Sequence, residues 1–589
     1  MSIVPLARIS IVGPLAQKQA LLGALQAFGC VHIEPIAESK GAAPAGPSQS
    51  ARRALRFLEA APAQRHQAHN AVGFDANRVE QRVLAIEDRL RNLEEERRFL
   101  QRRIRDLSPW GNFDLPDPEE RLGLRLWFYI VPQYLMARMP QDGIPWQVVH
   151  RDNRFCYVVA LAAEEPCGIP VARTHTGSLP LADLEQRLED LDIEEDDLQA
   201  ERMDLSRWRD LLAANIARLE DEAALAAAAS RTLDDDCLFV VSGWIPAVRM
   251  KALGQVVEQA SCAFIAAEPD DEADPPTMLS NRGFAACGQD LLSIYTTPGY
   301  RTWDPSLLLA GSFCLFFGLI LADVGYGLTL AAVTGFFWRT FDRSAGRRRL
   351  RALLLVLSAS AATIGILMGS YFGASPPAGS ILLHFQTFRS NDTVAMMELS
   401  AAIGVLHIAL GNFIAAGRSR GVQRLAPMGW ILVLAAGVAL YAGKTRGIEP
   451  MVWTSYAGFA VGGICVIGFS GAGQKPWARA TTGLLSVAKL SAAFGDVLSY
   501  LRLFALGFAG TSLALAFNEL AAKAAAQLET IGLLTAAMIL IVGHSLNFAL
   551  GIAGGFVHGL RLNFIEFFNW SAVSEGRPFV AFQKREVVP

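Results

Sequence analysis

The hydrophobic pattern divides the chain into two unlike parts. Up to about Tyr300 charged residues are frequent, and the apolar residues recur at the intervals of short strands and amphipathic helices. From Pro305 onward the chain consists of apolar stretches close to the roughly 20 residues that a helix needs to cross a bilayer. We therefore expect a soluble part at residues 1–300 and a membrane part at residues 301–589.

The soluble part begins and ends with strand and helix patterns. ARISIVG at residues 7–13, an amphipathic segment at 18–28 and CVHIEPI at 30–36 predict a strand, a helix and a strand. The chain returns through CLFVVSGWIP, a helix near residues 250–260 and CAFIAAE. Strand-like segments at 124–132 and 155–162 lie between these two regions. These patterns predict a rod with a small α/β lobe at each end.

Two heptad patterns lie between the predicted lobes, at about residues 76–110 and 181–230. The first has apolar side chains at alternating steps of four and three, with Arg97 interrupting: Val79, Val83, Ile86, Leu90, Leu93, Leu100, Ile104 and Leu107. The second contains Leu181, Leu184, Leu188, Leu191, Leu198, Leu205, Trp208 and Leu212. Because one compact insertion separates them, we expect an antiparallel coiled coil; two independently dimerising coiled coils are the alternative.

Eight apolar spans follow in the membrane part, at residues 306–321, 324–337, 353–372, 400–416, 430–442, 456–469, 484–520 and 531–568. The first two are short and joined by a tight turn. The last two are too long for an upright crossing, since about 37 residues at 1.5 Å per residue reach about 55 Å, against about 30 Å of hydrocarbon. We expect these two helices to tilt steeply or to protrude.

Basic residues follow every second span and predict the orientation. They are Arg339, Arg343, Arg347, Arg348, Arg349 and Arg351 after the second span, Arg418, Arg420 and Arg424 after the fourth, Lys475 and Arg479 after the sixth, and Arg577, Lys584 and Arg585 in the tail. The positive-inside rule then puts both termini in the cytoplasm, with Lys444 and Arg446 as exceptions. The N-terminal MSIVPLARISIVGP lacks the features of a signal peptide, in agreement with a cytoplasmic soluble part.

Composition and short motifs exclude several classes of function. The net charge of -3 is too small to indicate nucleic-acid binding. The eight cysteines show no CxxC pairing, which favours free thiols in a reducing compartment over a disulfide framework or a metal site. No GxxxxGK[ST] phosphate loop is present, so we expect no ATP chemistry on this chain and no cofactor.

Two arginines occur at or near membrane depth. Arg502 has long apolar flanks on both sides, and Arg561 closes the apolar run of the last span. A charge in hydrocarbon costs at least about 2.5–3.5 kcal/mol, and a guanidinium cannot escape this cost by losing its proton. Such residues either handle ions or snorkel toward the membrane surface.

Polar side chains of the last two spans gather into stripes. On the eighth span they fall within about 140° of one helical face, at about 100° per residue: His544, Asn547, His558, Arg561 and Glu566. On the seventh span one face carries Asp496, Tyr500, Thr511 and Asn518, while Arg502 points away and has Ser499 one turn before it. Such stripes predict a hydrated path, and hydrogen bonding between helices is the alternative.

Five motifs stand out in the two parts of the chain: GDVLSYLRLFALGFA at 495–509, GHSLNFALGIAGGFVHGLRLNFIEFF at 543–568, FFGLILADVGYG at 316–327, GSYFG at 369–373 and SGWIP at 242–246. Together they resemble the a-type membrane subunit, called subunit I in bacteria and archaea, of V-type and A-type rotary ATPases. The resemblance covers nearly the whole chain. It implies a multi-pass protein of the cell (inner) membrane with eight transmembrane helices and a cytoplasmic two-lobed coiled-coil arm.

The resemblance also implies residue roles. Arg502 matches the family's essential arginine, Arg561 matches its partner on the last helix, and His558 stands where relatives carry a polar side chain near that pair. The candidate liners of two ion half-channels are Glu566, Asp496, Ser499, His544 and Asn547. Gly510 and Gly551 replace polar or acidic residues of eukaryotic relatives, whereas His407 and Asp323 are interpreted as structural.

The partners that the resemblance implies are a rotating ring of proteolipid c/K subunits, the peripheral-stalk E and G subunits, a central-stalk collar subunit and the bilayer. The translocated ion is H⁺ or Na⁺. Two other classes compete with this reading. A secondary transporter would use intramembrane charges but shows an inverted repeat, which is absent here. A coiled-coil membrane scaffold would explain the arm but leaves the arginines unexplained.

Overall fold

The computed structural model describes residues 2–585 except 37–48, 69, 71, 114–122, 141–142, 177–179, 271–272, 378, 389–391, 473–474 and 528–530. The chain is mostly helical and forms two compact units. The arm unit comprises Ser10–Ser242, Ala252–Phe264 and Ala581–Pro589. The membrane unit comprises Met1–Ile9, Gly243–Lys251 and Ile265–Val580.

One sheet has five strands, in the order β2-β7-β1-β8 with β6 paired to β7. Its strands are β1 Leu6–Pro14, β2 His32–Glu34, β6 Leu233–Asp235, β7 Leu238–Pro246 and β8 Ala263–Ala267, and its helices are α1 Lys18–Phe28 and α6 Met250–Gln259. Alternate β1 side chains, such as Ile9 and Ile11, are buried, as the period of a strand requires. The strand, helix and strand order agrees with the pattern at residues 7–36.

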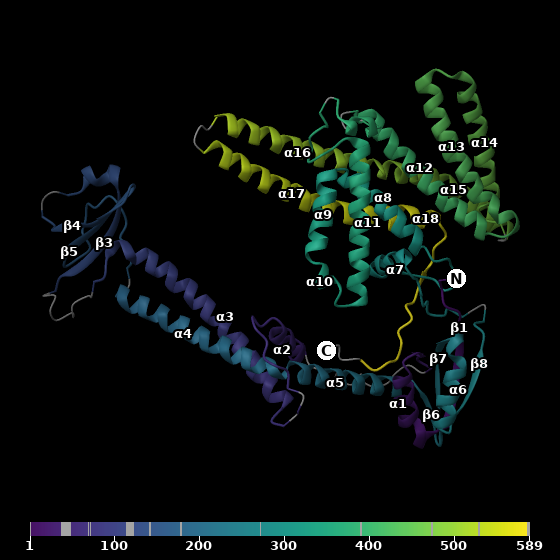
Figure 1. The fold of residues 1–589 in the computed structure, drawn as a ribbon, viewed down its shortest axis with the longest axis horizontal. Coiled ribbons are helices and arrows are strands. Elements are labelled where there is room, and N and C mark those ends of the chain that lie inside the picture. The colour runs from purple at the N-terminus through teal and green to yellow at the C-terminus, as the bar shows by residue number, and fades with distance from the viewer. Residues whose placement is uncertain are drawn as a thin grey trace. The chain divides into compact units, whose positions relative to one another are not determined.

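Beside the helices that accompany the five-stranded sheet, the arm unit contains α2 Gln49–Glu59, α3 Ala76–Leu107, α4 Leu181–Leu205 and α5 Arg209–Ala229. In Figure 1, α3 and α4 lie side by side over most of their length. Three ion pairs join them at seven-residue steps that rise on α3 and fall on α4: Arg82–Glu201, Arg89–Glu194 and Glu96–Arg187. Because the two numberings run in opposite directions, the helices are antiparallel.

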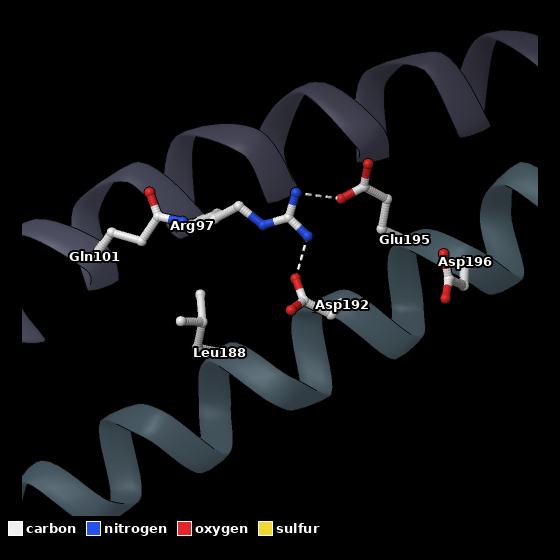
Figure 2. Close-up of a pocket in the computed structure, with 6 residues that line it drawn as sticks. All are labelled: Arg97, Gln101, Leu188, Asp192, Glu195 and Asp196. Atoms are coloured by element: carbon white, nitrogen blue, oxygen red, sulfur yellow. Dashed lines mark hydrogen bonds and ion pairs between the residues drawn. The ribbon is translucent and has the colours of Figure 1, made fainter.

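Arg97, the one polar interruption of the first heptad pattern, also joins the two helices. Its guanidinium forms ion pairs with Asp192 and Glu195 of α4, as Figure 2 shows. Its side chain is 28% exposed. The arginine is therefore accommodated at the edge of the seam by two carboxylates from its own chain.

A separate three-stranded antiparallel sheet contains β3 Arg125–Pro132, β4 Trp146–Arg151 and β5 Phe155–Ala162, in the order β3-β5-β4. Trp110, just after α3, packs edge-on against Phe128 and Tyr157 of this sheet. We expected an α/β lobe here. Within the described part of residues 123–176, however, the only helical segment is a 3₁₀ turn at Gln133–Arg138, and its connection to β4 contains Pro140 and Pro145, which cannot continue a helix.

The segment Ala581–Arg585 completes the arm unit. The Phe582 backbone N–H donates to the Val31 carbonyl at 2.7 Å, and Val31 and Phe582 form an antiparallel bridge. The Arg585 guanidinium forms an ion pair with Glu220 of α5 at 2.8 Å, and Glu220 also pairs with Arg52 of α2. This segment follows every membrane helix in the sequence, yet it packs among helices and strands of the arm.

The membrane unit is built from helices: α7 Phe284–Tyr295, α8 Ser306–Leu321, α9 Val324–Phe336, α10 Trp338–Phe341, α11 Ala345–Met368, α12 Thr393–Arg418, α13 Leu425–Arg446, α14 Glu449–Phe469, α15 Pro476–Ser499, α16 Leu501–Gln527, α17 Gly532–Arg561 and α18 Phe568–Trp570. Within the described residues, six stretches are long and apolar enough to cross a membrane: Ala345–Met368, Thr393–Arg418, Gly421–Arg446, Glu449–Phe469, Trp477–Gln527 and Gly532–Trp570. The shorter apolar helices α8 and α9 account for the first two predicted spans.

The core of the membrane unit forms where α8 packs against α7, α11 and α17. Leu309 and Phe313 of α8 are fully buried with Leu292 of α7 and Leu357 of α11. This packing explains why α7 belongs to the membrane unit, although we expected the soluble part to extend to residue 300.

Asp323 holds the turn between α8 and α9. Its carboxylate accepts hydrogen bonds from the Tyr326 N–H, which caps α9, and from the Ser370 hydroxyl and the Phe372 and Gly373 N–H groups. All of these partners belong to the short FFGLILADVGYG and GSYFG motifs. Asp323 is 2% exposed, so the interpretation of this carboxylate as structural agrees with its surroundings.

The seventh predicted span falls within one long apolar stretch, Trp477–Gln527, that a single residue divides into two helices. Helix α15 ends at Ser499 and α16 begins at Leu501. Tyr500, between them, is fully buried, and its hydroxyl hydrogen-bonds to His407 Nδ1 at 2.8 Å. Its ring lies against Gly404 of α12, where a Cβ would come within 2.8 Å of the ring. Packing of Tyr500 on α12 therefore accompanies the break, and a single helical face cannot be drawn across it.

The eighth span also departs from a uniform α-helix. After Arg561, the last residue of α17, the chain forms a π-helix at Leu562–Phe567. Each residue of an α-helix advances about 100° around the axis, and a π-turn holds an extra residue. Glu566 is consequently rotated away from the position that a continuous α-helix would give it, which changes the expected stripe at its C-terminal end.

Candidate functional site

Arg502 and Arg561 lie on two helices that pack against each other, α16 and α17, which Figure 1 shows side by side. Arg502 is the second residue of α16 and Arg561 is the last residue of α17. Both arginines therefore stand at irregular points of the helices, one beside the break at Tyr500 and one at the start of the π-helix. Arg502 is half-buried and Arg561 is exposed.

Three further predicted residues gather around the arginines. Glu566 and Arg561 both lie close enough to act electrostatically on Arg502. Ser499 lies close enough to act on the Glu566 carboxylate, and both guanidiniums act on the His558 ring. We call these five residues the arginine cluster. The structure thus brings together side chains from α15, α16, α17 and the π-helix.

The arginine cluster is not satisfied by its own chain. Within the described residues, neither guanidinium forms an ion pair or hydrogen bond, and three buried polar atoms lack a hydrogen-bond partner: Arg502 Nη1, His558 Nδ1 and Glu566 Oε2. Leaving such a group unpaired costs about 1–3 kcal/mol, and more for a charged one. The cluster therefore presents unused hydrogen-bonding capacity to whatever occupies the space beside it.

A cavity of about 460 Å³ lies between α8, α16 and α17. His558 lines it, and so do Tyr326 and Asn547. Gly510 and Gly551 also line it, and a Cβ on Gly551 would approach Leu321 Cδ1 to 2.7 Å. Gly510 and Gly551, which replace polar or acidic residues of eukaryotic relatives, thus leave open space in this cavity.

His544 and Asn547 lie in a hydrogen-bonded network with two other side chains. Tyr326 Oη is 2.8 Å from His544 Nδ1, and Asn518 Oδ1 is 3.0 Å from His544 Nε2. Asn547 Nδ2 donates to Tyr326 Oη at 2.9 Å and to the Gly510 carbonyl at 2.8 Å. We call these four residues the tyrosine–histidine network. Tyr326 was not identified from the sequence as a polar site residue, and its position in the GYG turn was its only sequence signal.

The other polar side chains of the seventh span have different surroundings. Asp496 accepts a hydrogen bond from Trp570 Nε1 at 2.7 Å and does not line the cavity. Thr511 lines the cavity, but its hydroxyl donates to the Gly507 carbonyl of its own helix. His407, which accompanies Tyr500, is stacked on Phe567 with ring centroids 4.2 Å apart. Asp496 thus lies apart from the arginine cluster and stays a predicted channel residue.

Cysteines and potential metal ligands add no further site. All eight cysteines are free thiols. Across the described part of the chain, no group of three or more histidine, cysteine, aspartate or glutamate side chains is arranged to hold a metal ion.

Comparison with known proteins found no matching family model. Among curated proteins, the chain is 27% identical over 426 residues to "V-type ATP synthase subunit I" of Chlamydia pneumoniae, covering 60% of this chain and 62% of the relative. It is 28% identical over 450 residues to "A-type ATP synthase subunit I" of Methanocaldococcus jannaschii, covering 69% and 64%. The match thus spans slightly less than two thirds of the length of these relatives.

A longer match is found in Chlamydia muridarum, where "V-type ATP synthase subunit I" is 25% identical over 575 residues, covering 84% of this chain and 86% of the relative. Among solved structures, the "cytoplasmic N-terminal domain of subunit I, homolog of subunit a, of V-ATPase" aligns over 44% of this chain at 16% identity, and its TM-score of 0.19 is too low to support an argument. By its sequence matches, this chain is similar over most of its length to subunit I of the V-type and A-type ATP synthases.

Proposed function

We propose that this chain is the stator's ion-translocating subunit in a V/A-type rotary ATPase. The observation that carries the proposal is the arginine cluster, in which Arg502, His558 and Glu566 each keep a buried polar atom without a partner. A ring of proteolipid subunits bearing carboxylates would supply what the cluster lacks. The names of the curated relatives support a place in such a complex.

The chemistry of a guanidinium suits this role. Arg502 keeps its positive charge at any working pH, so it favours the ionised form of a ring carboxylate that passes it. The same fixed charge opposes passage of a cation straight from one side of the membrane to the other. Arg561, being exposed beside the π-helix, adds a second positive charge along the ring's path. An ion must therefore leave or join the ring on either side of the arginines.

Two groups of residues supply these two sides. On one side, the 460 Å³ cavity extends from Tyr326 and Asn547 to His558 and forms one half-channel. On the other side, Ser499 and Glu566 lie at the junction of α15 and the π-helix, and we assign them to the second half-channel. We assign Asp496 to the second half-channel as well, where its carboxylate accepts a hydrogen bond from Trp570.

The wider architecture follows from the same proposal. The six long apolar stretches and the short helices α8 and α9 form eight transmembrane helices, with the last two tilted along the ring. The arm unit lies in the cytoplasm of the cell (inner) membrane and binds the peripheral-stalk E and G subunits and the central-stalk collar. ATP is made or hydrolysed on partner chains, and this chain couples that chemistry to H⁺ or Na⁺ flow.

The test is ion pumping by the assembled complex in inverted membrane vesicles after Arg502→Ala. Arg446→Ala is the control, because Arg446 also lies at a helix end, that of α13, but is exposed and lies outside the arginine cluster. We expect Arg502→Ala to abolish ATP-driven pumping while assembly and ATP hydrolysis persist, and Arg446→Ala to pump normally. Pumping at the unmodified rate by an assembled Arg502→Ala complex would contradict the proposal and return the transporter and scaffold alternatives.

A further inference from the structure

We infer that the tyrosine–histidine network is a proton relay gated by Asn518, at the end of the cavity remote from the arginine cluster. This inference rests on the proposed function and goes beyond it, because it assigns the half-channel a specific carrier, a direction of hydrogen bonds and a gate. Tyr326 and Asn547 line the cavity, whereas His544 and Asn518 lie behind them.

The backbone contacts of the two amides fix the direction of every hydrogen bond. Asn518 Nδ2 donates to the Phe372 carbonyl at 2.8 Å, so Asn518 Oδ1 is the atom that faces His544. An amide oxygen only accepts, and His544 Nε2 must therefore carry the hydrogen. Asn547 Nδ2 donates to the Gly510 carbonyl and to Tyr326 Oη, so its orientation is fixed in the same way.

The remaining hydrogen follows from these assignments. With Nε2 protonated, the Nδ1 of neutral His544 is an acceptor, and the Tyr326 hydroxyl donates to it. The donors thus run in one direction: from Asn547 to Tyr326, from Tyr326 to His544, and from His544 to Asn518. A proton can move along such a chain only if each member can both receive and release one.

Tyr326 and His544 meet that condition, and Asn518 does not. A hydronium ion in the cavity can give a proton to Tyr326 Oη while the original Tyr326 proton passes to His544 Nδ1, which leaves water, tyrosine and imidazolium. The imidazolium then loses its Nε2 proton to a water molecule on the far side, which becomes hydronium and leaves the His544 hydrogen on Nδ1. A half-turn of the imidazole ring and rotation of the Tyr326 hydroxyl restore the starting arrangement for the next proton. Asn518 Oδ1 covers Nε2 and is not a base, so the second transfer requires the Asn518 side chain to turn away.

The position of the network fits a gate on the non-cytoplasmic side. In the proposed orientation, α16 ends and α17 begins on that side, and His544 lies 12 residues after Gly532, or about 18 Å along the helix at 1.5 Å per residue. His558 lies a further 14 residues on, at the opposite end of the cavity. The cavity therefore connects the relay to the arginine cluster.

Few other titratable groups act on His544. Asp323, ahead of α9, lies within electrostatic range, but both of its oxygens are occupied by the hydrogen bonds that hold the turn. On α16, Glu519 follows Asn518 in the sequence and is exposed. Proton exchange in this part of the unit thus falls to Tyr326 and His544.

The chain provides a matched control in a second tyrosine–histidine pair. Tyr500 Oη and His407 Nδ1 are also 2.8 Å apart and belong to the same unit, but neither residue lines the cavity. Tyr500→Phe removes the same hydroxyl from the same kind of hydrogen bond. An effect limited to Tyr326→Phe would therefore come from the cavity and not from loss of a buried tyrosine–histidine contact.

The experiment measures ATP-driven acidification of inverted vesicles by the assembled complex as a function of the pH inside the vesicles. We expect Tyr326→Phe and His544→Gln each to slow acidification at least about tenfold and to remove its dependence on that pH, while Tyr500→Phe retains both. Asn518→Ala, which uncovers Nε2 and leaves both proton carriers in place, should instead acidify the vesicles at least as fast as the unmodified complex.

Arg502→Ala, tested in parallel, separates the inference from the proposed function. Loss of pumping in Arg502→Ala with unchanged pumping in Tyr326→Phe and His544→Gln overturns the relay and leaves the rotary function in place. Pumping that survives all three substitutions overturns both. Equal losses in Tyr326→Phe and Tyr500→Phe, or transport that carries Na⁺ at an unchanged rate in Tyr326→Phe, would also contradict a proton relay.

Discussion

Arg97 in the arm and Arg502 in the membrane unit both interrupt an apolar pattern, but their surroundings differ. Arg97 is paired with Asp192 and Glu195 of the neighbouring helix. Arg502 forms no ion pair with any described residue, and its Nη1 is buried without a partner. The difference teaches that a charge paired within its own chain specifies the fold, whereas a buried charge without a partner in the chain indicates a partner outside it.

The largest expected effect, on coupled ion transport, comes from removing the unpaired charge of Arg502. We expect Arg502→Gln to reduce coupled ion transport at least about 100-fold, because a neutral side chain no longer favours an ionised carboxylate. The thermal stability of the purified chain should not fall, since no hydrogen bond within the described chain is lost. Transport in vesicles and thermal unfolding in detergent measure the two quantities. A large drop in stability would mean that Arg502 is structural and would remove the contrast with Arg97.

Glu566→Gln should have the next largest effect. The Glu566 side chain is 2% exposed and lies within electrostatic range of both arginines, so its charge offsets theirs. Loss of that charge should lower pumping about tenfold and also destabilise the chain, unlike Arg502→Gln. Pumping and unfolding temperature are measured together, with Glu519→Gln on the exposed side of α16 as the control. Equal behaviour of Glu566→Gln and Glu519→Gln would contradict the role of this carboxylate.

Arg97→Leu should make the arm more stable but the pairing of α3 with α4 less specific. A leucine would continue the apolar seam between α3 and α4, whereas a polar residue in such a seam defines the pairing at a cost in stability. We expect a higher unfolding temperature together with self-association of the purified chain, seen by size-exclusion chromatography. Arg98→Leu is the matched control, because Arg98 is exposed and pairs within its own helix. A variant that stayed as monodisperse as the unmodified chain would show that Arg97 does not specify pairing.

Charge exchange across the arm should have a smaller effect. Glu96→Arg alone places two arginines opposite each other, because Arg187 is its partner at 2.9 Å. The side chains are 35% and 45% exposed, so we expect a loss of at most about 1 kcal/mol. The double exchange with Arg187→Glu should recover most of it, as a double-mutant cycle on denaturant unfolding would measure. No recovery would mean that this contact does not contribute to the pairing of α3 and α4.

The pH dependence of stability that comes from the ion pairs between α3 and α4 should be the smallest effect. The hydrogen-bonded Arg89 guanidinium lowers the pKa of Glu194 below its ordinary value. A carboxyl with a lowered folded-state pKa contributes stability above its unfolded pKa of about 4.3 and loses it as the pH falls through the folded value. We expect unfolding temperatures of the unmodified chain and of Glu194→Gln to converge between pH 5 and about pH 3. A constant difference across this range would exclude the linkage.

The regular parts of the fold were accessible from the sequence because they depend on short-range periodicity. Helix α8 occupies the predicted span at Ser306–Leu321, and α1 occupies the predicted helix at Lys18–Phe28. The break at Tyr500 was not accessible, because no proline or glycine marks it and the packing that accompanies it involves α12, a helix distant in the sequence. Across the described part of residues 123–176, the second sheet is accompanied by a 3₁₀ turn and by no α-helix, and strand patterns alone do not show what covers a sheet.

The candidate site was predicted where charge itself was the signal. Arg502, Arg561, His558 and Glu566 stand out in apolar sequence, and the structure brings them together. Tyr326 could not be found in this way. A tyrosine in an apolar helix is common, and its importance depends on two partners more than 200 positions away in the sequence, His544 and Asn547.

Packing of the segment Ala581–Arg585 into the arm unit has a consequence for biosynthesis. Val31, just before β2, and Glu220 of α5 are translated long before the membrane helices, but their contacts with Phe582 and Arg585 require residues that emerge after all of them. During synthesis Val31 and Glu220 therefore lack these contacts until the membrane helices have left the ribosome. Completion of the arm thus reports that translation has passed the last membrane helix, which provides an order for maturation and a point at which truncated chains can be distinguished.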